Sequence, residues 1–145
     1  FQPPAWHLPE NLEIALADAD FRFVSSARDI ATTVSADART AISGVNGISL
    51  IYPERLPRSG LLHFTSNFQA TSSPERAFQI IDAGGLLCIK AHIFKSGGGH
   101  TMIDGLDDLY CNYLDLLFTS LERRYGDALW WTSMSEIAAN VEQTC

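Results

Sequence analysis

The sequence predicts an α/β fold in which helices lie outside a sheet of parallel strands. From residue 74 onward, amphipathic helical patterns alternate with short apolar runs that are typical of buried strands. Such alternation requires crossover connections, which keep the strands parallel and the helices on the outside. The 145 residues, of which 46% are hydrophobic and 19% charged, match one ordinary globular domain.

Residues 1–68 are predicted to contain one helix and three strands. A short helix begins after Pro9, where apolar residues take near-helical spacing. The run 21–26, FRFVSS, is rich in aromatic and β-branched residues and predicts a strand. Further strands are predicted at 47–54, which a proline cuts off, and at 61–68.

The next two elements form a helix and strand pair. A helix opens at Ser73-Pro74, with the serine as N-cap, and stops at Gly84-Gly85. The apolar run 85–94, GLLCIKAHIF, is short enough for a strand buried on both faces. The glycine-rich stretch SGGGH after it predicts a flexible loop.

The last elements are predicted to be a long helix, a strand and a terminal helix. Apolar residues over 106–121 repeat every three and four positions, which predicts a helix of about six turns. Gly126 suits the end of that helix. ALWWT at 128–132 predicts a strand, and Ser133 with Glu136 forms a capping box that starts the terminal helix.

Charge and cysteine content exclude several classes of function. The net charge of -7 and the pI near 4.9 argue against nucleic acid and anionic membrane surfaces as partners. The apolar runs are too short for a membrane span. The three cysteines (Cys88, Cys111 and Cys145) are an odd number without zinc or redox spacing, so we expect free thiols and a reducing, cytoplasmic location.

Polar residues that follow predicted strands are the candidates for chemistry, because ligands of parallel sheets bind at the carboxyl ends of the strands. His92 stands out, since an imidazole titrates near neutrality and acts as a general acid or base. A buried histidine satisfied by a backbone carbonyl is an equally good interpretation. A metal site of His92, His100 and Asp104 is a third, although its spacing matches no compact motif.

Three segments resemble the polysaccharide deacetylase (NodB-homology) family, or carbohydrate esterase family four. The opening FQPPAWHLP, followed by a helix, an aromatic strand and Asp29, is similar to the family segment in which F-R-x-P precedes the same elements. IKAHIF resembles a later family strand that carries a leucine and a histidine near its end. YGDALWWTSMSEIA resembles the family's last strand and final helix. The resemblance covers nearly the whole chain in element order.

The resemblance implies that residues 1–145 are a single partial domain, the C-terminal half of a distorted β/α barrel. Family members remove acetyl groups from N-acetylated sugars with a divalent metal, which one Asp and two His of the N-terminal half hold. Neither a TFDD-like strand end nor an HxxxH pair occurs here. We therefore expect a zinc-like metal in the complete enzyme and none held by this chain alone. The chain starts abruptly inside a motif, so a missing N-terminal half or a partner chain is expected to complete it.

The resemblance also implies catalytic roles. His92 matches the general acid that protonates the leaving amine. Ala5 matches the residue whose backbone N–H helps to form the oxyanion hole. Asp29 matches loosely the aspartate that pairs with the motif arginine. Two positions depart from the pattern: Gln2 replaces that arginine and Lys90 replaces a pocket leucine.

Four residues are predicted to contact a carbohydrate: Pro4, Trp6, His7 and Asn67. The alternative function is therefore a non-catalytic carbohydrate-binding or assembly subunit on the same fold. It would use Trp6, His7 and one outward-facing tryptophan of the Trp130-Trp131 pair to stack on sugars. The loss of the motif arginine at Gln2 favours this alternative.

Overall fold

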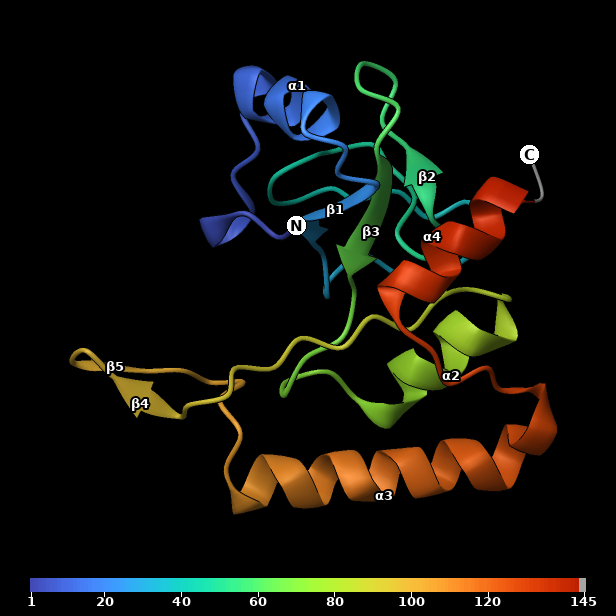
Figure 1. Cartoon of the computed structure of the whole chain (residues 1–145). Helices are drawn as coiled ribbons and strands as arrows, with labels where there is room; N and C mark the ends of the chain where they lie inside the picture. Colours follow the sequence, from blue (N-terminus) through green and yellow to red (C-terminus); the bar gives the residue numbers. More distant parts are fainter. Residues whose placement is uncertain (144–145) are drawn as a thin grey trace.

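The central sheet has three strands in the order β1-β3-β2, in a computed structural model that describes residues 1–143. Strands β1 (Phe23–Arg28) and β3 (Leu62–Ser66) are parallel, whereas the short β2 (Glu54–Arg55) pairs antiparallel with β3. Figure 1 shows the carboxyl end of β3 pointing toward two helices that lie side by side below it. The chain is thus a mixed α/β structure whose central sheet has one parallel and one antiparallel strand pair.

All four predicted helices are present. They are α1 (Glu10–Asp18), α2 (Pro74–Asp82), α3 (Asp108–Tyr125) and α4 (Met134–Gln143). Two short 3-10 turns, η1 (Pro4–Trp6) and η2 (Gly126–Ala128), lie near the start of the chain and after α3. The capping box is confirmed, because Ser133 Oγ accepts from Glu136 N–H while Glu136 Oε2 accepts from Ser133 N–H. None of the described helices is long and apolar enough to cross a membrane.

The predictions of strands at 85–94 and 128–132 are wrong, because neither segment forms a regular strand. Residues 85–94 run beside the end of β3 and form only isolated bridges, Phe68 with Ile89 and His92 with Gly105. Asn67 explains why no continuous ladder forms beside β3: its side-chain oxygen, and not a backbone carbonyl, accepts from Cys88 N–H at 2.8 Å. Residues 129–133 are irregular and link η2 to α4.

The strand predicted at 47–54 is also wrong over most of its length. Residues 46–52 form turns and bends, and only Glu54 belongs to a strand. Ser49 Oγ accepts from Tyr52 N–H at 2.9 Å, and Thr65 Oγ1 donates to Ser49 O at 3.0 Å. The backbone of this run pairs with residues 38–40 through a single bridge, Arg39 with Ser49, and side chains satisfy other groups, so no regular strand forms. Leu50 and Ile51 are still buried, so the apolar run indicated the core correctly.

The glycine-rich loop forms a hairpin. Strands β4 (Ser96–Gly97) and β5 (His100–Thr101) pair antiparallel around a turn at Gly98 and Gly99. Figure 1 shows this hairpin projecting from the body of the molecule. The hairpin folds the chain back, so residues before and after it meet at its base.

The first residues of the chain run along β1. The Phe1 ammonium donates to Phe23 O at 3.1 Å, and Ser25 N–H donates to Phe1 O at 2.9 Å. A bulge in β1 falls between Val24 and Ala27, and the freed Ser26 N–H donates to His63 Nε2 at 3.1 Å. Burial lowers the pKa of His63 to about 4, so the ring is neutral and accepts this bond at physiological pH. This arrangement places η1 beside the sheet.

The cysteine prediction holds for the described residues. Cys88 and Cys111 are free, and Cys145 lies outside the described part of the chain. Burial raises the pKa of the Cys88 thiol to about 12, which makes it a core residue and not a nucleophile.

Candidate functional site

A pocket of about 460 Å³ lies between η1, the end of β3 and the segment that follows Gly85. Its position at the carboxyl end of the parallel strands is where the sequence predicted a site. The pocket is lined by Gln2, Pro3, Pro4, Ala5, Trp6, Ser66, Cys88, Ile89, Lys90, Ala91, His92 and Met134. Four of the predicted site residues therefore come together: Pro4, Ala5, Trp6 and His92.

The wall formed by η1 has an unusual backbone. Ala5 and Trp6 both lie in the left-handed region, with φ of 52° and 55°. Two such residues in succession cost about 1–2 kcal/mol each, and strain of this kind concentrates at functional sites. Gly44 allows the conformation, because a Cβ at that position would lie 2.1 Å from the Trp6 carbonyl oxygen. The aromatic wall of the pocket is thus held in a defined position.

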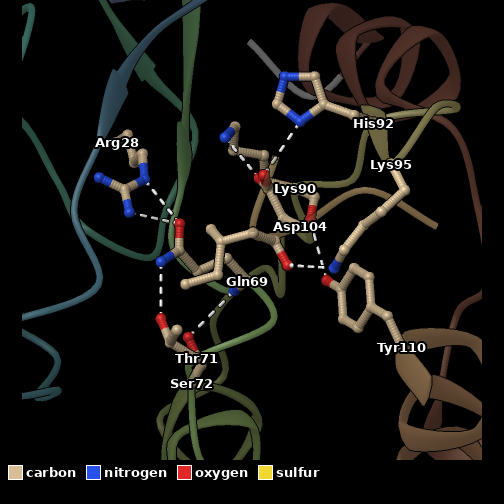
Figure 2. Close-up of polar contacts among 10 residues, drawn as sticks. Arg28, Gln69, Thr71, Ser72, Lys90, His92, Lys95, Asp104 and Tyr110 are labelled. Carbon is tan, nitrogen blue, oxygen red and sulfur yellow. Dashed lines mark hydrogen bonds and ion pairs between the residues drawn. The ribbon is translucent and has the colours of Figure 1, made fainter. Parts of the chain in front are cut away.

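His92 is held by an aspartate. His92 Nδ1 lies 3.0 Å from Asp104 Oδ1, and Lys90 Nζ forms an ion pair with the second oxygen of the same carboxylate. Figure 2 shows His92 and Lys90 converging on Asp104. The backbone fixes the pair as well, since His92 N–H donates to Asp104 O at 2.8 Å. Because Nδ1 is engaged, Nε2 is the ring nitrogen left for a ligand.

Asp104 is ionised in this arrangement. Its side chain is almost completely buried, and burial alone would raise its pKa. The hydrogen bond from Lys90 and the charges of Lys90 and His92 outweigh burial and hold the pKa below its usual range. Asp104 therefore orients His92 as a carboxylate.

Helix α3 supports the same cluster. Tyr110 Oη donates to Lys90 O at 2.9 Å (Figure 2), and Asp107 caps the helix by accepting from Tyr110 N–H at 2.8 Å. Lys95 at the base of the hairpin forms an ion pair with Asp107 at 3.1 Å. The long helix and the hairpin thus brace the segment that carries Lys90 and His92.

Asp29 lies outside the pocket lining. Its side chain is completely buried and accepts four hydrogen bonds, from Ala31 N–H, Thr32 N–H, Thr32 Oγ1 and Ala41 N–H. Burial alone would raise the pKa of Asp29, but these bonds hold it below its usual range. The carboxylate is therefore directed into the loop that follows β1.

Asn67 and His7 also do not line the pocket. Asn67 is buried, and its amide donates to Leu50 O and Leu86 O while it accepts from Cys88 N–H. Asn67 thus joins the end of β3 to the backbone at Leu50 and to the backbone at Leu86 and Cys88, and it supports the pocket without lining it. His7 is exposed just beyond η1.

The described residues include the possible metal trio of His92, His100 and Asp104. No group of three or more His, Cys, Asp or Glu side chains within residues 1–143 is arranged to hold a metal ion. Of the trio His92, His100 and Asp104, only His92 and Asp104 are in contact, because His100 lies exposed on β5.

The partnership of His92 with Asp104 was missed from the sequence, where Asp104 was considered only as a metal ligand. One signal was available: Gly98, in the glycine-rich turn, is equidistant in sequence from His92 and Asp104. A hairpin there brings the two residues together, which the interpretation as a flexible loop did not consider.

Comparison with known proteins adds no relative. No family model, no curated protein and no solved structure matches this chain.

Proposed function

We propose that this chain is the C-terminal part of a metal-dependent hydrolase that removes acetyl groups from N-acetylated sugars or polysaccharide. One observation carries the proposal: a histidine held by a buried carboxylate shares one pocket with η1. His92, Pro4 and Ala5 were assigned to one site by the resemblance alone, and all three line this pocket. The same proposal places the sheet in a distorted β/α barrel. It places the protein in a reducing compartment such as the cytoplasm.

In this proposal the pocket residues take the roles that the resemblance implies. His92, held through Nδ1, presents Nε2 and protonates the amine that leaves when the amide C–N bond breaks. The oxygen of the attacking water ends in the acetate. The Ala5 backbone N–H stabilises the oxyanion of the tetrahedral intermediate, and the Trp6 ring provides a stacking surface for a sugar.

The divalent metal of this proposal would supply the activated water. Because residues 1–143 contain no suitable ligand cluster, its ligands belong to other residues, either upstream of Phe1 or on a partner chain. The same residues would carry the general base. The chain by itself is therefore expected to bind substrate without turning it over.

A non-catalytic carbohydrate-binding subunit is the second candidate. A second pocket, of about 390 Å³, lies between α2, the end of α3 and α4, and Trp130 and Trp131 form part of its lining. Both tryptophans are more than half exposed, at 58% and 53%. Exposed tryptophans beside a pocket favour stacking on sugar rings.

Acetate release tests the proposed function. The protein carrying every residue that its gene encodes is incubated with zinc and an N-acetylated oligosaccharide, and acetate and free amine are measured. We expect equal amounts of both products and no release after chelation of the metal. Absence of release from N-acetylated glycans by this metal-loaded protein, with binding retained, would favour the carbohydrate-binding subunit instead.

A further inference from the structure

Arg28 is a cation without an acidic partner. Its guanidinium lies within 4.0 Å of no carboxylate among the described residues. Other arginines of the chain do pair with carboxylates: Arg22, Arg39, Arg58 and Arg124. Arg76 is also half-buried and has no carboxylate within 4.0 Å among residues 1–143, but all three of its guanidinium nitrogens donate to backbone carbonyls. Arg28, which is half-buried too, lacks such a complete set of acceptors.

The Arg28 side chain is fixed in one orientation. Its Nε and Nη2 both donate to Gln69 Oε1, and Gln69 Nε2 in turn donates to Thr71 Oγ1 at 2.7 Å. Gln69 is buried, so a neutral amide holds the arginine without cancelling its charge. Figure 2 shows the third guanidinium nitrogen pointing away from Gln69. This nitrogen, Nη1, makes no hydrogen bond within the described residues.

Arg28 lies next to the pocket that contains His92. It is the last residue of β1 and pairs with Ser66, which lines the pocket. Its Cζ lies 5.6 Å from the centre of the Trp6 ring, and Lys90 Nζ lies 4.9 Å from the same ring. Asp104 pairs with Lys90, whereas the charge of Arg28 has no carboxylate within 4.0 Å among residues 1–143.

We propose that Arg28 is an anion-binding residue of this pocket, and that the substrate is an N-acetylated sugar bearing a carboxylate or phosphate group. The second half of this statement rests on the proposed function. An arginine held by a neutral amide keeps its full charge and a free donor for the ligand, and a fixed guanidinium loses little entropy on binding. A charge-assisted hydrogen bond of this kind discriminates an acidic sugar from a neutral one.

Binding of three matched sugars to the chain tests the proposal. The probes are N-acetylglucosamine, which is neutral, N-acetylglucosamine 6-phosphate, and N-acetylmuramic acid, which carries a carboxylate. Inorganic phosphate is the fourth probe, and calorimetric titration gives each Kd. We expect at least one acidic sugar to bind about 10-fold or more tightly than the neutral one, with a preference that weakens as salt is added.

Charge variants at two positions give the controls. Arg28→Gln is expected to reduce the preference to within about two-fold, and Arg28→Lys, which keeps the charge but loses the paired donors, to retain part of it. Arg124→Gln removes the same charge from α3 and should leave the preference unchanged. Circular dichroism of each variant verifies folding.

The outcomes separate the two proposals. Binding of the neutral sugar without any preference for the acidic ones would overturn the anion site and leave the proposed function standing. Binding of phosphate alone, lost in Arg28→Gln, would support the anion site and count against a sugar substrate. A preference that survives in Arg28→Gln would also overturn the assignment of Arg28.

Discussion

Asp104→Asn is expected to lower the kcat of acetate release by the complete, metal-loaded protein about 100-fold, within the range that positioned acid catalysis supplies. An amide holds His92 Nδ1 less strongly than a carboxylate and does not compensate a protonated imidazole. The same change removes the ionic partner of Lys90. Because Asp104 itself does not line the pocket, the loss should appear mainly in kcat.

The neighbouring Asp108→Asn is the matched control. Asp108 is exposed in the first turn of α3, so its loss changes the net charge equally without touching His92. We expect kcat to be unaffected there. Equal losses of kcat in both variants would mean that the effect is one of overall charge or stability. An unchanged kcat in Asp104→Asn would show that Asp104 does not position His92 for catalysis.

Asp29→Ala is expected to lower the free energy of unfolding by about 3–5 kcal/mol. The substitution removes the buried carboxylate that accepts from three backbone N–H groups and from the Thr32 hydroxyl. Chemical denaturation followed by circular dichroism measures the change. Asp37→Ala, an exposed residue of the same loop, should change the free energy of unfolding by less than about 0.5 kcal/mol.

The same variant should alter the response to acid. The pKa of Asp29 lies below its usual value in the folded protein. The ionised carboxylate therefore contributes its full stabilisation above the pKa of the unfolded chain, about 3.9. That contribution is lost as the pH falls through the lower folded pKa. Asp29→Ala should therefore lose less stability than the wild type on acidification. A parallel pH dependence in both proteins would contradict the anchoring role of Asp29.

The helices were predictable because their signals are local. The repeat of apolar residues along α3 needs no knowledge of the rest of the chain, and the Ser133 and Glu136 box forms within a single turn. The parallel strands β1 and β3 were also predictable, since both contain aromatic and β-branched residues in short runs.

Strands were wrongly predicted at 47–54 and 85–94 because the structure of these runs depends on distant contacts that a single sequence does not display. The runs at 47–54 and 85–94 have strand composition, and both are held by one distant side chain, that of Asn67. Asn67 bonds the backbone of each run, so hydrogen bonds that a ladder would use go to an amide. Asn67 was expected to bind substrate because it follows a strand, and the structure gives it this bridging position instead.

The site was predictable only in part for the same reason. Pro4, Ala5, Trp6 and His92 were proposed as site residues, and they share a pocket. Arg28 escaped notice because an arginine before Asp29 has no distinctive local pattern, and only the fold brings it to Gln69 and Trp6. That no carboxylate of residues 1–143 pairs with Arg28 is a property of the three-dimensional arrangement alone.

The most direct test of the account is where an N-acetylated sugar binds. The three tryptophans serve as reporters, because Trp6 lines the pocket of His92 whereas Trp130 and Trp131 line the other pocket. In a nitrogen-15-labelled chain, the indole N–H signals are followed by NMR as N,N′,N″-triacetylchitotriose is added. The account predicts that the Trp6 signal shifts while those of Trp130 and Trp131 stay in place; shifts of Trp130 and Trp131 with an unchanged Trp6 would contradict it.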